Sequence, residues 1–256
     1  MKKSGRRAAL LLLSMVSVTG VIKGTMAYFT DTETKVNVFT MGDLDLGLTE
    51  PEWDPDPEGG SSDGSDMYPG YTVYKNPTIK NITSDKNGAE PCYARIRINI
   101  RTHSGEAVKD ERVLEMISQM IYFDGTFTGT YDKKGSASGL IEGRSPGYSL
   151  KDLEKYHHIN PIFVKDEKRS LPSSPVYNYM GTEKDGILDI GEEATLFTTI
   201  VIPTDWNQTH LSALGDFRLD IEAECIQCSG FTDQEAAFCA LDEEASGAGL
   251  LQRENN

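Results

Sequence analysis

The sequence has few of the residues that catalytic sites need. Only four histidines and four cysteines occur among 256 residues, and 25 basic residues stand against 40 acidic ones, for a net charge of -15. No His-Glu-x-x-His pair and no phosphate-binding glycine loop is present. We therefore predict that the chain is not an enzyme, that it has no catalytic residues, and that it needs no cofactor.

The cysteines are too few for a fold that depends on disulfide bonds. They are Cys92, Cys225, Cys228 and Cys239; one or two bridges would fit an exported protein, and the sequence leaves their pairing open. Cys225 and Cys228 have redox-motif spacing, but they continue an alternating strand, so they should point to opposite faces. This favours a structural role over a redox centre, and a zinc site has only this one close pair in its support.

The N-terminus has the composition of an export signal. Basic residues precede an apolar run, Ala8 to Ile22, that is shorter than the roughly 20 residues needed to span a bilayer. Small residues at Thr25 and Ala27 predict cleavage between Ala27 and Tyr28, which makes 1–27 a signal peptide; an uncleaved anchor is the alternative. The mature chain then has 20 basic and 40 acidic residues, a net charge of -20. We expect no binding to nucleic acid.

The rest of the chain, 28–256, is predicted to form a single antiparallel β-sandwich. Apolar and polar residues alternate in several short runs separated by turn residues, as half-buried strands require. The runs lie at 44–48, 71–75, 93–101 and 217–225, and a run that is apolar on both sides lies at 194–202. Residues 77–81 read as a further strand. The fold class is therefore mostly β, with short helices inserted.

Three stretches depart from this rhythm. The segment 51–67 is an acidic loop in which Asp54, Asp56, Asp63 and Asp66 are weak candidates for a calcium site. A helical and loop insertion is expected at about 102–184, with a helix over 110–122 and a helix start at Ser149. A capping box at Thr232 predicts a short helix, and 243–256 should be a polar tail.

Several ordered motifs resemble the TasA/camelysin family of secreted bacterial matrix proteins. They are Ala27-Tyr28-Phe29-Thr30-Asp31, Asn37-Val38-Phe39 and Gly42-Asp43-Leu44-Asp45-Leu46, and later Cys92-Tyr93-Ala94-Arg95, the run 196–206 and the run 223–231. The resemblance implies a jelly-roll sandwich, release by a dedicated signal peptidase of the SipW type, and a place in the extracellular matrix or at the cell surface of a bacterium.

The same resemblance implies a function in biofilm fibres. A subunit of such a fibre would self-associate by donor-strand exchange, in which the N-terminal segment of one copy completes the sheet of the next, and other matrix proteins could join it. The assembly segment would carry Tyr28, Phe29, Val36, Val38 and Phe39. The alternatives are a secreted metal-dependent peptidase of camelysin type and a monomeric, calcium-stabilised adhesin.

Overall fold

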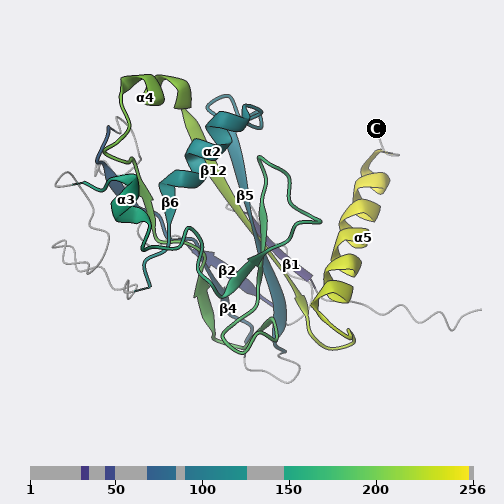
Figure 1. Ribbon diagram of the computed structural model, residues 1–256. Helices are drawn as coiled ribbons and strands as arrows, with labels where there is room; N and C mark the ends of the chain where they lie inside the picture. Colours follow the sequence, from purple (N-terminus) through teal and green to yellow (C-terminus); the bar gives the residue numbers. More distant parts are fainter. Residues whose placement is uncertain (1–29, 35–43, 50–67, 85–89, 126–146, 254–256) are drawn as a thin grey trace, which may run out of the picture.

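The computed structural model describes residues 30–34, 44–49, 68–84, 90–125 and 147–253. Antiparallel sheets and a few short helices make up this part of the chain (Figure 1). The predicted mostly-β class is confirmed. Within the described residues, no helix is both long enough and apolar enough to cross a bilayer.

The largest sheet is built on two long strands, β5 (Cys92–Thr102) and β12 (Phe217–Gln227), which pair along their whole length. The order is β1-β12-β5-β8-β7, with β9 also paired to β5. The other members are β1 (Thr30–Thr34), β7 (Phe163–Lys165), β8 (Val176–Tyr179) and β9 (Ile187–Leu188). The first strand of the described chain therefore lies next to the last.

Two smaller sheets complete the sandwich. One has the order β10-β4-β2 and the other β3-β11-β6. Their strands are β2 (Leu46–Thr49), β3 (Thr72–Tyr74), β4 (Thr78–Asn81), β6 (Ile121–Tyr122), β10 (Glu193–Thr195) and β11 (Thr199–Val201). One buried cluster joins both sheets to the large one, through residues such as Ile79, Ile98 and Ile200. This cluster is the core of the sandwich.

The helices follow local sequence signals. Asp110 caps α2 (Glu111–Met120), which buries Leu114, Ile117 and Met120 as its spacing predicts. Ser149 forms a capping box at α3 (Leu150–Leu153), and α4 (Gln208–Leu214) has a capping box at Asn207. The last helix is α5 (Gln234–Arg253).

Two expected segments differ in the structure. The stretch 102–184 is not only helix and loop, because it also supplies β6, β7 and β8. These strands have two to four residues, too few for a period of two to show in the sequence. The tail 243–256 continues as helix to Arg253, because its alanines, leucines and glutamates favour helix.

The run 194–202 is also different from its prediction. It is divided between two sheets, with β10 in one and β11 in the other, instead of forming one central strand. The residues from Leu196 to Ile202 are all buried, as the two-sided apolar pattern predicted. The backbone must bend to change sheets, and a run of apolar residues contains no signal for such a bend.

Candidate functional site

The side of β12 that faces away from β5 is the part of the fold that matches the predicted assembly chemistry. β12 pairs with β5 on one side and with β1 on the other, in the antiparallel register Thr30 opposite Ile226 through Thr34 opposite Glu222. We call β1 and the residues 222–226 together the β1–β12 edge. A strand at this position satisfies backbone groups that an open edge would leave unpaired.

β1 brings little apolar surface to this pairing. Its sequence is Thr-Asp-Thr-Glu-Thr, and the register places Glu33 opposite Ala223 and Asp31 opposite Cys225, two residues of β12 that are fully buried. A strand without large apolar residues gains little from hydrophobic burial, so its attachment depends mainly on the backbone ladder. Such a strand is easier to remove from its sheet than an apolar one.

The other predicted residues of the assembly segment lie outside the described residues. These are Tyr28, Phe29, Val36, Val38 and Phe39, and the same holds for the predicted cleavage site at Ala27. The candidate calcium ligands Asp54, Asp56, Asp63 and Asp66 also lie outside. Of the predicted segment 28–39, the structure thus describes the five residues of β1.

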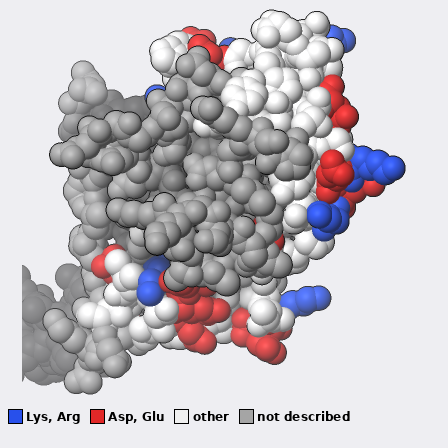
Figure 2. Space-filling model, turned by 90° about the vertical axis from the view of Figure 1, so that its left-hand side faces the viewer, with Lys and Arg blue, Asp and Glu red and all other residues white. Residues whose placement is uncertain are grey.

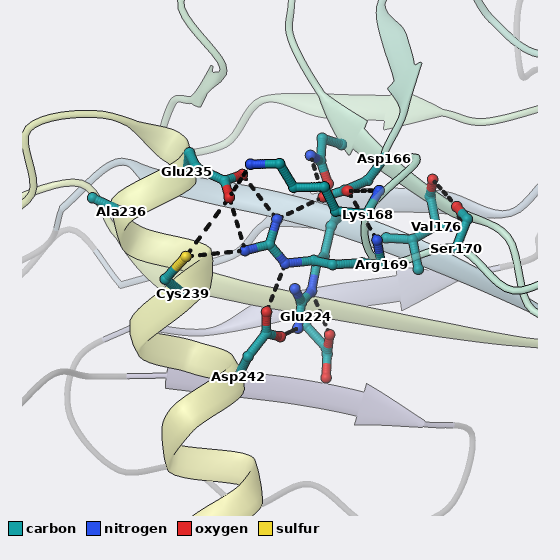
Figure 3. Close-up of polar contacts among 12 residues, drawn as sticks. Asp166, Lys168, Arg169, Ser170, Val176, Glu224, Glu235, Ala236, Cys239 and Asp242 are labelled. Atoms are coloured by element: carbon teal, nitrogen blue, oxygen red, sulfur yellow. Dashed lines mark hydrogen bonds and ion pairs between the residues drawn. The ribbon is translucent and has the colours of Figure 1, made fainter.

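A network of ion pairs lies on the outer face of the large sheet, close to the β1–β12 edge (Figure 3). Arg95 of β5 donates to Glu224 of β12 at 2.6 Å and to Asp242 of α5 at 2.7 Å. Arg169 donates to Asp166 at 2.9 Å, to Glu235 at 2.9 Å and to Asp242 at 2.6 Å. Asp242 therefore links two arginines that come from different parts of the chain.

Electrostatics within this network favours the charged forms. Burial acts to raise the pKa of Asp166, but hydrogen bonds from Arg169 and Asn178 outweigh it, and the pKa is lowered. For Asp242 the hydrogen bonds from Arg95 and Arg169 likewise overcome burial and lower the pKa. Burial disfavours the charge on Arg169, yet its carboxylate partners raise its pKa overall. All three groups are ionised at neutral pH.

One signal for this network is present in the sequence, although the sequence-based prediction did not include it. Glu235, Cys239 and Asp242 recur at spacings of four and three, which places them on one face of a helix. In the structure the Sγ atom of Cys239 lies 3.4 Å from Nη2 of Arg169. The arginine that they meet is far away in sequence, so its identity could not be inferred from the spacing.

All four cysteines lie in the described part of the chain, and no disulfide bond joins them. Cys225 is buried in the main core, whereas Cys228 packs against a second cluster that contains Ile226 and Phe238. The pair therefore faces opposite sides of the sheet, as the strand alternation indicated. Burial, with the charge of the nearby Cys92 as a further cause, raises the pKa of Cys228 to about 12.

This pKa predicts slow alkylation of Cys228. At pH 8 a thiol of pKa about 12 is ionised to roughly one part in ten thousand, against about a tenth for an ordinary thiol, and only the thiolate reacts. We expect iodoacetamide to label the exposed Cys239 first and to label Cys228 about a thousandfold more slowly than an ordinary thiol. Peptide mass spectrometry of briefly treated native protein measures this. Equal labelling of the two cysteines would contradict the assignment.

Charge is distributed in patches over the surface. Figure 2 shows acidic side chains gathered along the lower rim of one face, with basic side chains beside some of them. Ion pairs that are half-buried or exposed include Arg101 with Asp220 and Lys168 with Glu235. Exposed ion pairs stabilise a fold little, so the pairs expected to matter most are those of the buried Arg95 and the largely buried Arg169.

Comparison with known proteins finds a family model that matches part of the chain. The model of the camelysin metallo-endopeptidase family matches residues 5–86, about the first third of the chain. The resemblance to the camelysin family is confirmed. Neither a curated protein nor a solved structure matches the chain.

The camelysin match corrects one prediction. We expected from the missing catalytic motifs that the chain is not an enzyme, and the name of the matching family, a metallo-endopeptidase, contradicts this. The prediction failed because it was based on known short motifs, and a metal site can be assembled from residues that lie far apart in sequence.

A metallo-endopeptidase implies a metal, and the described residues do not bring together a set of ligands for one. Among them, no three histidine, cysteine, aspartate or glutamate side chains are placed to share an ion. His158 meets the Ile121 carbonyl, and His210 lies against Asn207 at the start of α4. Both histidines are therefore engaged in local structural contacts.

Proposed function

We propose that the chain is a secreted structural subunit of an extracellular biofilm fibre, and that it assembles by donating its N-terminal strand to the sheet of a neighbouring copy. The observation that carries the proposal is the pairing of β1 with β12 at the margin of the large sheet. β1 begins three residues after the predicted cleavage site at Ala27. The sequence motifs that resemble the TasA/camelysin family of secreted matrix proteins also support the proposal.

The ladder between β1 and β12 can form within one chain or between two. The backbone bonds are the same in both cases, so the cost of exchange is mainly the release of β1 from its own edge. That cost is low for a strand of threonines and acids. A head-to-tail contact of this kind does not close on itself, and it therefore grows a filament.

In this proposal, removal of the leader starts assembly. A signal peptidase would release the chain at Tyr28, and the freed strand would then be able to enter the edge of another copy outside the cell. The partner is thus a second copy of the chain, with other matrix proteins as further partners. The strongly acidic mature chain repels nucleic acid, which agrees with a structural function.

Deleting Tyr28 to Thr34 tests the proposal. We expect the truncated chain to stay a folded monomer and to form no fibres, because the two long strands and the core remain while the donor strand is lost. Negative-stain microscopy after long incubation measures assembly, and circular dichroism measures folding. Fibres of normal length would show that assembly uses another surface, and an unfolded product would show that β1 belongs to its own core.

A single substitution sharpens this test. Glu33→Pro removes a backbone donor that points toward β12, because Glu33 and Ala223 form a hydrogen-bonded pair of the ladder, whereas the control Glu33→Ser changes the same side chain and keeps the ladder intact. We expect fibres from the serine variant and none from the proline variant. Loss of fibres in both variants would contradict a function that depends on the backbone of β1.

The second candidate function is a secreted metal-dependent peptidase, favoured by the name of the matching family. Casein hydrolysis by the purified chain, with and without a chelator, measures this activity. Hydrolysis that the chelator abolishes would support it. Fibre formation and casein hydrolysis are independent properties, so a positive result in one test does not exclude a positive result in the other.

A further inference from the structure

The C-terminal helix is attached to the large sheet at the same place as β1. In Figure 1, α5 stands on the right, next to the end of β12 that pairs with β1. A cluster separate from the main core lies under the helix. It consists of Tyr93, Ile226, Ala237, Phe238 and Leu241.

β12 contributes to both attachments with the same residues. Ile226 is the register partner of Thr30 and is fully buried in the cluster under α5. Glu224 is the register partner of Thr32 and accepts a 2.6 Å hydrogen bond from Arg95. β1 thus binds residues 222–226 along their backbone edge, while α5 covers the face of the sheet beside them.

Ion pairs connect the helix to the sheet around this cluster. Arg95 is only 3% exposed, and its guanidinium lies over the Phe238 ring at 5.0 Å. Within the described residues, its Nη1 atom has no hydrogen-bond partner. The carboxylates of Glu224 and Asp242 balance the charge of the guanidinium. If α5 leaves, Arg95 loses Asp242 and the cover of Phe238, and its pair with Glu224 opens to water.

Arg169 holds the helix from the other side. It contacts Glu235 and Asp242, which lie seven residues apart on α5, and it is fixed in turn by the buried Asp166. The side chains of Glu235 and Asp242 are 47% and 41% exposed. Salt can therefore screen their pairs with the arginines, although the apolar cluster beneath them stays dry.

We propose that α5 is an ionic latch over the β1–β12 edge. While it is docked, α5 holds residues 222–226 flat against β5 and keeps β1 in place; when its ion pairs are weakened, the edge loosens and β1 leaves more often. The latch would set the rate at which copies exchange strands. This inference rests on the proposed function for its purpose, but the coupling itself is a property of the single chain.

Hydrogen exchange of the full chain, followed by mass spectrometry, tests the latch. Arg169→Gln removes the charge that bridges Glu235 and Asp242. The matched control is Arg218→Gln, at the far end of β12, where the arginine contacts only the exposed Asp220 among the ion pairs of the described residues. Asp242→Asn is a milder second variant, in case Arg169→Gln does not fold.

We expect backbone amides of 222–226 and of α5 to exchange about tenfold faster in Arg169→Gln than in the unchanged chain, because the helix loses the partly exposed pairs of Arg169 with Glu235 and Asp242. Arg218→Gln should exchange at the unchanged rate in both segments. Added sodium chloride should accelerate both segments in the unchanged chain and have less effect in Arg169→Gln.

Two results would overturn the latch. Faster exchange in α5 with unchanged exchange in 222–226 would show that the helix is not coupled to the edge. Unchanged exchange in both would show that the ion pairs do not hold the helix. Neither result depends on fibres, so the proposed function is tested separately by Glu33→Pro: fibres that persist in that variant would remove the function and leave the coupling standing.

Discussion

Cys225→Asp is expected to lower the free energy of unfolding by about 3–5 kcal/mol. Cys225 is fully buried in the main core, on the face of β12 that also carries Ala223 and Ile221. A carboxylate on that face would lie among apolar side chains, because the arginines Arg95 and Arg169 lie on the other side of the sheet, with α5. Urea denaturation followed by circular dichroism measures the loss.

Cys228→Ser is the matched comparison. Cys228 is only half-buried and packs at the margin of the second cluster, so we expect a loss of less than about 1 kcal/mol. The two cysteines are three residues apart, and the difference between the variants therefore reports their environments. Similar losses of unfolding free energy in both variants would indicate a disulfide bridge or a metal site that joins the two cysteines. That result would contradict the structure, in which no disulfide bond joins the two thiols.

Phe238→Ala is expected to detach α5. Phe238 is fully buried between the helix and the sheet, with the guanidinium of Arg95 at 5.0 Å and that of Arg169 at 5.9 Å from its ring. Truncating such a phenylalanine costs roughly 3–5 kcal/mol. We expect this loss to exceed the free energy that attaches the helix, because the attachment consists of one small cluster and a few ion pairs. The far-ultraviolet circular dichroism spectrum should lose helical signal.

The rest of the sandwich should remain folded in this variant, since the main core does not include Phe238. The thermal transition of the sheets would then shift much less than the helical signal. Phe238→Leu keeps most of the apolar volume and should retain the helix. If Phe238→Ala unfolds the whole chain in one step, α5 is an integral part of the sandwich and cannot act as a latch.

The long elements could be predicted well from the sequence. β5 and β12 have eleven residues each, and their alternation is clear enough to assign the core face, including the opposite orientations of Cys225 and Cys228. The helix α2 was predicted from the helical spacing of its apolar residues, and the start of α3 from the serine-to-acid spacing at Ser149, which forms a capping box in the structure. These features depend on residues that are close in sequence.

What could not be predicted depends on distant residues. The arginines of β5 alternate with isoleucines, and this pattern indicated a face in contact with solvent. Arg95 is instead buried under α5, because Phe238 and Asp242, which cover it, come from the other end of the chain. Alternation shows that two faces differ, but it does not show what covers the more polar one.

The position of β1 beside β12 also sets an order of events in folding. The first strand of the described chain pairs with the last one, so its place does not exist until almost the whole chain is available. Pairings between the two ends of a chain carry a large loop-closure cost and form late. Each new molecule therefore passes through an interval in which its N-terminal strand is complete and its own partner strand is still absent. If copies exchange strands as proposed, the finished edge of an older molecule can accept β1 during that interval, and exchange would be fastest where new chains are most concentrated.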